Sequence, residues 1–229
     1  MDSAAWDDRY AASDLVWSAE PNVWVRELCA RMPPGRALDS AAGEGRNALW
    51  LAEQGWAVTA TDFSPVAVTR IGELADRRLD GDARGRLEAV VADATEGPPG
   101  TAYDLVVLSY LHLPQDAWTR ALAAAVEATV PGGAVVVVAH ARRNLTEGVG
   151  GPQDAEILLD PDDLVRSASG LPVDVELAEI REREVLGAPR PALDTAALLR
   201  VRDPADPTSP TSSVRLRRGS GYTGPSPAI

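Results

Sequence analysis

The chain has 229 residues, of which 45% are hydrophobic. That length suffices for one sizeable α/β core and is short for two full domains. Acidic side chains outnumber basic ones by 34 to 22, and every basic side chain is an arginine. Because an acidic surface repels phosphate backbones and acidic lipid surfaces, we expect neither a nucleic-acid partner nor a membrane partner.

The composition also limits metal and redox chemistry. One cysteine and two histidines cannot form an internal disulfide and are too few for most thiolate or imidazole metal sites, so no metal site is expected. No run of about 18 apolar residues occurs, and Met1 is followed by acidic residues in place of a basic and apolar leader. We therefore expect a cytoplasmic protein. Its small size and acidic charge are compatible with a monomer or a weak homodimer.

A first helix is predicted from Pro21, and Pro33-Pro34-Gly35 ends it. Its apolar residues recur at helical spacing: Val25, Leu28, Cys29 and Met32. Cys29 therefore lies on an apolar face. We interpret it as a small buried hydrophobe and not as a nucleophile, because no histidine lies nearby in the sequence to activate it.

Short apolar runs then alternate with amphipathic ones, which is typical of a parallel sheet with helices on its faces. Strands are predicted at 37–38, 57–61, 87–92, 103–110, 135–138, 173–184 and 193–202. The last two have a short connection, so they should be antiparallel. The intervening helices begin after the glycine turn at 43–45, at Ser64-Pro65, at Pro114 and at Asp160-Pro161, with Trp56 in phase with the first of them. Residues 80–85 and 140–154 are predicted loops, and Pro131-Gly132-Gly133 is predicted to break a helix.

This pattern predicts a Rossmann-like α/β fold, in which a seven-stranded, mostly parallel sheet has an antiparallel final strand and helices on both faces. We divide the chain into an N-terminal lid and helix (1–35), a ligand-binding domain (36–202) and a disordered tail rich in Pro, Ser, Thr and Gly (203–229). The lid carries Trp6, Tyr10 and Trp17, which either cover a bound ligand or fill gaps against the first helix.

Glycines at Gly43 and Gly45 occupy a strand-to-helix turn, where the backbone can approach a ligand closely. Such a turn alone serves dehydrogenases, flavoproteins and methyltransferases alike. Asp39, which ends the preceding strand, would be unfavourable beside a pyrophosphate and suits a cationic ligand. Asp62, 17 residues after Gly45, can accept from both hydroxyls of a ribose, or it is a helix N-terminal charge beside Ser64.

A third acid, Asp93, also follows a strand, where it could accept from an adenine amino group. The carboxyl ends of parallel strands meet at one edge of the sheet, so these acids should converge there with the strand end at Ser109-Tyr110. Spaced motifs then carry a resemblance to class I S-adenosylmethionine-dependent methyltransferases over roughly residues 36 to 140: LDSAAGEGRNALWLA, VTATDFSP, VVADAT, YDLVVLSYLHLP and VPGGAVVVV. The chain looks most similar to the branch with tellurite-resistance and thiopurine methyltransferases, whose N-terminal tryptophans resemble Trp6 and Trp17 here.

The resemblance implies S-adenosylmethionine as cofactor, with Asp39 and the 43–45 backbone at its methionine moiety. Asp62 would bind the ribose, Phe63 would pack on the adenine and Trp17 would cover the cofactor. Ala41 replaces a glycine that is common in the family and narrows the backbone gap. The implied cofactor-binding residues are Trp17, Asp39, Ala41, Gly43, Gly45, Asn47, Asp62, Phe63, Ser64, Asp93, Ala94, Ser109 and Leu113.

The methyl acceptor is expected to be a small molecule whose identity the sequence leaves open. Methyl transfer is an in-line displacement, so positioning can supply most of the catalysis and a general base is optional. Predicted catalytic residues are His112 and His140, which follow the fourth and fifth strands, and Arg143 in the next loop. His112 could instead be structural, and Arg143 could pair with nearby Glu147 or Asp154. An NAD-dependent oxidoreductase and a non-catalytic S-adenosylmethionine-binding module are the alternative functions.

Overall fold

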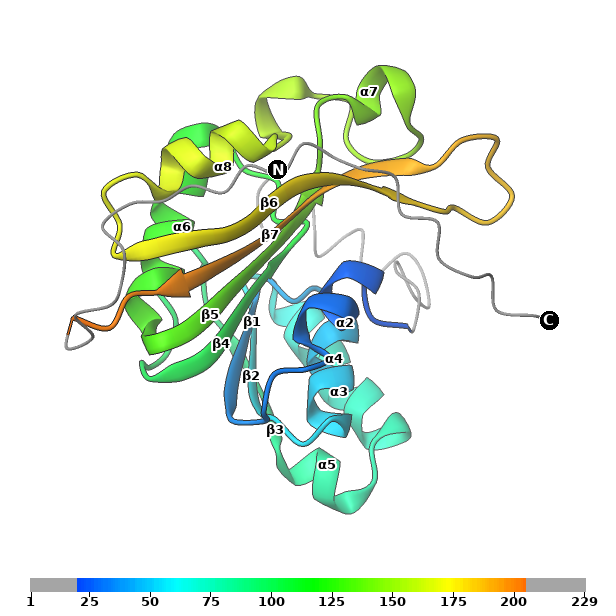
Figure 1. Ribbon diagram of the computed structural model, residues 1–229. Helices are drawn as coiled ribbons and strands as arrows, with labels where there is room; N and C mark the ends of the chain where they lie inside the picture. Colours follow the sequence, from blue (N-terminus) through cyan, green and yellow to red (C-terminus); the bar gives the residue numbers. More distant parts are fainter. Residues whose placement is uncertain (1–19, 205–229) are drawn as a thin grey trace.

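Seven strands form a single sheet in the computed structural model, which describes residues 20–204 (Figure 1). The strand order is β3-β2-β1-β4-β5-β7-β6. The pairs among the first five are parallel, and β7 is antiparallel to both neighbours. The predicted fold class is therefore confirmed. The strands are β1 Arg36–Ser40, β2 Ala57–Asp62, β3 Leu87–Val91, β4 Tyr103–Ser109, β5 Thr129–His140, β6 Val173–Arg183 and β7 Ala192–Val201.

Helices cover both faces of this sheet, as Figure 1 shows. One face carries α2 Val23–Cys29, α3 Arg46–Glu53 and α4 Pro65–Arg78, with the short α5 Gly81–Gly85 beside α3 and β3. The other face carries α6 Gln115–Ala128 and α8 Pro161–Ala168. The connection from β5 to α8 contains α7 Asn144–Glu147 and the 3-10 turn η1 Ala155–Ile157.

Alternation along the central strands divides the core into two layers. Val106 and Leu108 of β4 pack on the side of α6 and α8, whereas Leu105 and Val107 pack on the side of α2, α3 and α4. Cys29 lies buried in this second layer, as its helical phase predicts. Because both faces are covered, the run 135–138 of β5 is apolar at every position and entirely buried.

Four local predictions need correction. The predicted loop 80–85 contains α5, because the Asp80 side chain accepts from the Ala83 N–H and caps a helical turn. The predicted loop 140–154 contains α7. Trp56 lies beyond the end of α3, buried at the start of β2. Residues 131–133 belong to β5, where Gly132 has a positive φ and the pairing with β4 shifts register.

The turn between β1 and α3 contains three residues in left-handed conformation, at every second position. Ala41 and Gly43 both have φ of 57°, and Gly45, the N-cap of α3, has φ of 81°. A Cβ atom on Gly45 would lie 2.9 Å from the Ile71 Cγ1 atom of α4, so glycine also allows α3 and α4 to pack closely. The left-handed conformation of Ala41 costs about 1–2 kcal/mol for any residue that has a Cβ atom. This cost explains why glycine is common at this position in the proteins that the sequence resembles.

We expect Gly45→Ala to lower the free energy of unfolding by about 1–3 kcal/mol, because the new Cβ sits in left-handed backbone and against Ile71. Gly72→Ala is the matched control, since Gly72 lies within α4 and a Cβ there meets nothing within 4 Å. That control should be neutral or stabilise by about 0.5–1 kcal/mol. Urea denaturation of both variants measures the difference, and equal stabilities would contradict this account of the turn.

Candidate active site

A cavity of about 1460 Å³ lies at the carboxyl edge of the parallel strands. The segments after β1, β2, β3, β4 and β5 line it, together with the start of α2 and the end of β6. Most of the predicted site residues contribute to its wall: Ala41, Gly43, Asn47, Asp62, Phe63, Asp93, Ala94, Ser109, His112, Leu113 and His140.

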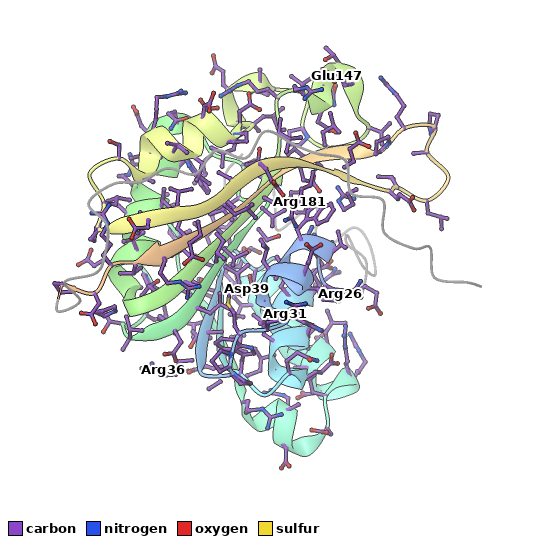
Figure 2. All side chains as sticks on the ribbon, in the orientation of Figure 1. Arg26, Arg31, Arg36, Asp39, Glu147 and Arg181 are labelled. Atoms are coloured by element: carbon purple, nitrogen blue, oxygen red, sulfur yellow. The ribbon has the colours of Figure 1, made fainter. Side chains whose placement is uncertain are left out.

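The carboxylate of Asp39 is fully buried near the end of β1, where Figure 2 labels it inside the molecule. Asp39 is not among the residues that line the cavity. Neither of its oxygens makes a hydrogen bond of ordinary geometry with any residue between 20 and 204. Burial raises the pKa of Asp39 to about 7; the Ala48 N–H and Arg46 oppose this rise, and Asp62 adds to it. A carboxylate in this state lacks a cationic partner, which a ligand ammonium would supply.

Asp62 at the end of β2 is oriented by the backbone. Its Oδ2 accepts from the Gly43 N–H at 2.8 Å and its Oδ1 accepts from the Ser64 N–H at 3.0 Å. Each carboxylate oxygen has a second lone pair, so both can also accept from neighbouring hydroxyls of a ligand. Asp62 therefore links the glycine turn to the cavity, and Ser64 holds Asp62 and caps α4 without lining the wall.

Two further predicted polar residues lie beyond Asp62. Asp93 is exposed on the cavity wall, where its Oδ1 accepts from the Thr95 N–H and from the Thr95 hydroxyl, both at 2.8 Å. Ser109 ends β4, and its buried hydroxyl has no partner in the described part of the chain. An orphaned hydroxyl at a cavity wall is a position where a ligand polar group can bind.

A hydrogen-bond network centred on Asp194 forms the wall opposite the glycine turn. This carboxylate of β7 is fully buried. Its Oδ2 accepts from Arg183 Nε at 2.7 Å, from the Tyr110 hydroxyl at 2.9 Å and from Trp24 Nε1 at 3.1 Å. Its Oδ1 lies 3.1 Å from His140 Nδ1, an ion-pair contact that is not aligned as a hydrogen bond. Burial alone would raise the pKa of Asp194, but the interactions with His140 and Arg183 outweigh it and hold this pKa below the ordinary value.

The two histidines stack beside this network. The His112 and His140 rings are nearly parallel with centroids 5.5 Å apart, and the Tyr110 ring lies 4.8 Å from His140. Burial, and then the neighbouring His140, lower the pKa of His112 to about 4. His112 is therefore a neutral imidazole at physiological pH, and its Nε2 has no hydrogen-bond partner among residues 20–204.

Some predicted residues are not brought into this site. Arg143 does not line the cavity; its exposed side chain pairs with Glu147 one helical turn later, which Figure 2 places at the periphery on α7. Gly45 lies behind the wall against α4. Trp17 and the other aromatics of the predicted lid lie outside the described residues, as does the predicted tail from 205 onward.

The network also contains residues that sequence reasoning missed. The polar ones are Asn22, Trp24, Arg46, Arg183 and Asp194. A signal for Asp194 was present, because a lone acid within the otherwise apolar and small run 192–199 is expected to be buried and paired. The partners of Asp194 could not be identified from the sequence, because they depend on how β7 pairs with β5.

Comparisons with known proteins agree with this geometry. Residues 37–133 match a family model described as a methyltransferase domain. A search of curated proteins finds no match. Among residues 20–204, no helix is long and apolar enough to cross a membrane, and no group of three or more His, Cys, Asp or Glu residues is arranged to hold a metal ion.

Solved structures share the fold. A protein studied for the conversion of a disulfide bond into a thioacetal group during echinomycin biosynthesis is 21% identical with a TM-score of 0.71, over 87% of this chain and 91% of that one. The glycopeptide N-methyltransferase MtfA in complex with S-adenosylmethionine is 21% identical with a TM-score of 0.61, over 78% and 92%. TehB from Haemophilus influenzae is 17% identical with a TM-score of 0.63, over 86% and 67%.

Asp39→Asn should make the protein more stable at alkaline pH. The folded-state pKa of about 7 lies above the ordinary 3.8, so the folded state binds more protons than the unfolded state and wild-type stability falls as pH rises between those values. Asparagine does not ionise, so the variant's gain in melting temperature should be absent near pH 4 and largest above pH 7. Its affinity for S-adenosylmethionine should fall by about 1.5–3 kcal/mol. A variant that is less stable at all pH values would contradict the unpartnered carboxylate.

Asp62→Ala should weaken S-adenosylmethionine binding by about 1.5–3 kcal/mol through loss of charge-assisted hydrogen bonds. It should also lower the melting temperature, because the Gly43 and Ser64 amides lose their acceptor. Calorimetry measures the first effect and thermal unfolding the second. Glu176→Ala, which removes a surface ion pair with Arg200, is the control that should change neither by much. Unchanged affinity in Asp62→Ala would make Asp62 purely structural.

Proposed function

We propose that this S-adenosylmethionine-dependent methyltransferase acts on a small-molecule acceptor by in-line displacement, with most of its catalysis coming from positioning. The observation that carries the proposal is a single cavity whose wall has two chemically different halves. One half is the glycine turn with Asp62 at the ends of β1 and β2, and the other contains the imidazoles after β4 and β5.

The first half fits the cofactor. S-adenosylmethionine, when bound, supplies a methyl group on a sulfonium centre. Asp39 would provide the negative charge opposite its α-ammonium group, and the Gly43 backbone would lie along the methionine moiety. Asp62 would accept from the ribose hydroxyls, and Phe63 would pack on the adenine, beside Asp93 and Ala94. The buried Asp39 carboxylate supports this assignment, because its negative charge behind the glycine turn favours a cationic group in the cavity without touching it.

The second half would hold the acceptor and exclude water. Tyr110, Leu111 and Leu113 line it with largely apolar surface, and Gly151, Pro152 and Ile157 close it from the loop after β5. Holding two reactants at contact distance in a dry site converts a bimolecular displacement into an effectively unimolecular step, which can contribute about 7–11 kcal/mol of barrier lowering. The geometry of this half supports an acceptor of small-molecule size.

The same glycine turn is compatible with a dinucleotide only if its surroundings tolerate phosphate. Asp39 lies directly behind the turn, and Asp62 and Glu44 lie beside it on the cavity wall. Glu44 is paired with Arg70, but the Asp39 and Asp62 carboxylates at the N-terminal end of α3 oppose the negative pyrophosphate that a nicotinamide cofactor would bring there. This arrangement favours a cationic cofactor over NAD.

We expect S-adenosylmethionine and S-adenosylhomocysteine to raise the melting temperature, whereas NAD leaves it unchanged. Saturation at about 100 times the dissociation constant corresponds to about 2.7 kcal/mol of added stability. Differential scanning fluorimetry measures the shift. Stabilisation by NAD and not by S-adenosylmethionine would overturn the proposal.

An acceptor screen then tests turnover. Release of S-adenosylhomocysteine is followed with matched pairs of small molecules that differ in the nucleophilic atom, such as phenol and thiophenol, with tellurite and amines alongside. Turnover with one class identifies the acceptor chemistry. Tight S-adenosylmethionine binding without transfer to any class would favour a non-catalytic binding module.

A further inference from the structure

The antiparallel pairing of β7 places an acid beside a cavity histidine. His140, the last residue of β5, is the register partner of Asp194 near the start of β7. Because β7 runs opposite to β5, its first residues lie at the edge where the parallel strands end. Asp194 therefore approaches the cavity although it belongs to the beginning and not the end of a strand.

The pairing also fixes which edge of the imidazole is available. Nδ1 of His140 faces Asp194 Oδ1 at 3.1 Å, so Nε2 lies on the opposite edge of the ring. That edge faces Gly151, where a Cβ atom would lie 2.8 Å from Nε2 and 2.6 Å from Cδ2. Gly151 therefore packs against part of this edge, where any side chain would collide with the ring, and both residues remain on the cavity wall.

The charged and titratable groups around His140 come from several elements. Asp194 of β7 is its carboxylate partner, and Arg183 of β6 shares that carboxylate. After β4, Tyr110 donates to Asp194, and burial raises the Tyr110 pKa above its ordinary value so that its proton stays in place. His112 stacks on the ring as a neutral imidazole, and Arg46 of α3 lies over the Tyr110 ring at 5.6 Å.

We infer that Asp194 positions His140 as the general base of the reaction, and that the acceptor presents a hydroxyl group as its nucleophile. The inference rests on the proposed function. The carboxylate favours the tautomer with the proton on Nδ1, which leaves the Nε2 lone pair directed away from Asp194 toward the cavity. It also stabilises the imidazolium that proton transfer creates. His140 is the catalytic residue in this assignment and Asp194 is a positioning residue.

The chemical step balances with these groups alone. The hydroxyl proton moves to His140 Nε2 as an oxygen lone pair forms the new O–C bond to the methyl carbon. The C–S bond breaks, and its electron pair stays on sulfur as a neutral thioether. The positive charge of the sulfonium thus ends as the imidazolium charge beside Asp194, and the proton leaves to solvent before the next turnover.

The presence of a general base at His140 indicates which class of acceptor the site serves. A thiolate or a metalloid anion already carries its nucleophilic lone pair near neutral pH and gains little from proton removal. A hydroxyl is a poor nucleophile until its proton is removed, and a positioned base contributes about 10²–10⁴-fold to such steps. A carboxylate–imidazole pair on the cavity wall therefore fits a hydroxyl acceptor.

Nitrogen-15 NMR of the full chain with S-adenosylhomocysteine tests the positioning directly, because only two imidazoles are present and His112→Gln identifies them. In its neutral form, the His140 ring should carry its proton on Nδ1. Asp194→Asn should shift the proton to Nε2 in a large fraction of molecules. A wild-type protein with its proton on Nε2 would overturn the inference.

Activity on the matched phenol and thiophenol pair provides the second test. His140→Gln and Asp194→Asn should lower kcat for the hydroxyl by about 10²-fold or more with a smaller change in KM. For the Asp194 variant, the acidic limb of the pH profile should move to lower pH. Transfer to the thiol should change less than tenfold, about 1.4 kcal/mol or less.

The matched control is Asp163→Asn, which removes another buried carboxylate outside the cavity, where it pairs with Arg142 and Arg166. It should lower stability and leave the imidazole tautomers and the pH profile unchanged. If the protein methylates only thiols, and His140→Gln does so at the wild-type rate, the general-base assignment is wrong and the proposed methyltransferase function still stands. Failure to bind S-adenosylmethionine at all would instead reject the proposed function.

Discussion

The buried carboxylate of Asp194 sets the geometry of the acceptor half of the site. An ion removed from water costs several kcal/mol unless charges and hydrogen-bond donors replace its hydration. Here side chains from α2, from the segment after β4 and from β6 donate hydrogen bonds, and His140 at the end of β5 lies 3.1 Å away. Satisfying this one group therefore fixes the positions of side chains from four parts of the chain. The arrangement of this part of the cavity wall follows from the need to surround the Asp194 carboxylate with polar groups.

Asp39 is buried to the same extent and has the opposite environment. Four side chains surround the Asp194 carboxylate, whereas the Asp39 oxygens make no well-formed hydrogen bond within residues 20–204. The pKa values follow, since that of Asp194 lies below its ordinary value and that of Asp39 is raised to about 7. The two buried acids therefore differ in role: the one with protein partners stabilises the fold, and the one without a partner is available to interact with a ligand. Asp194 belongs to the architecture, and Asp39 lacks the charge that a cationic ligand brings.

Much of the half of the cavity that fits the cofactor could be predicted from the sequence, because its residues directly follow successive strands. Asp62, Phe63 and Ser109 reach the cavity or its wall for that reason, since parallel strands end at one edge. Asp194 could not be placed in this way, because its position depends on the register of an antiparallel strand more than fifty residues after β5. Arg143 was misplaced because a local partner one helical turn away, Glu147, satisfies it before it can reach the cavity.

The two halves of the cavity are coupled through the start of α2. The Asn22 N–H donates to Asn47 Oδ1 in the first turn of α3, next to the glycine turn, at 2.9 Å. The Asn22 side chain caps α2 and also donates to the Tyr110 hydroxyl at 3.0 Å, and two residues later Trp24 donates to Asp194. Asn22, Trp24 and Tyr110 therefore connect the first turn of α3 with the carboxylate beside His140. The wall at the glycine turn and the wall at the histidines are thus held in one hydrogen-bonded arrangement.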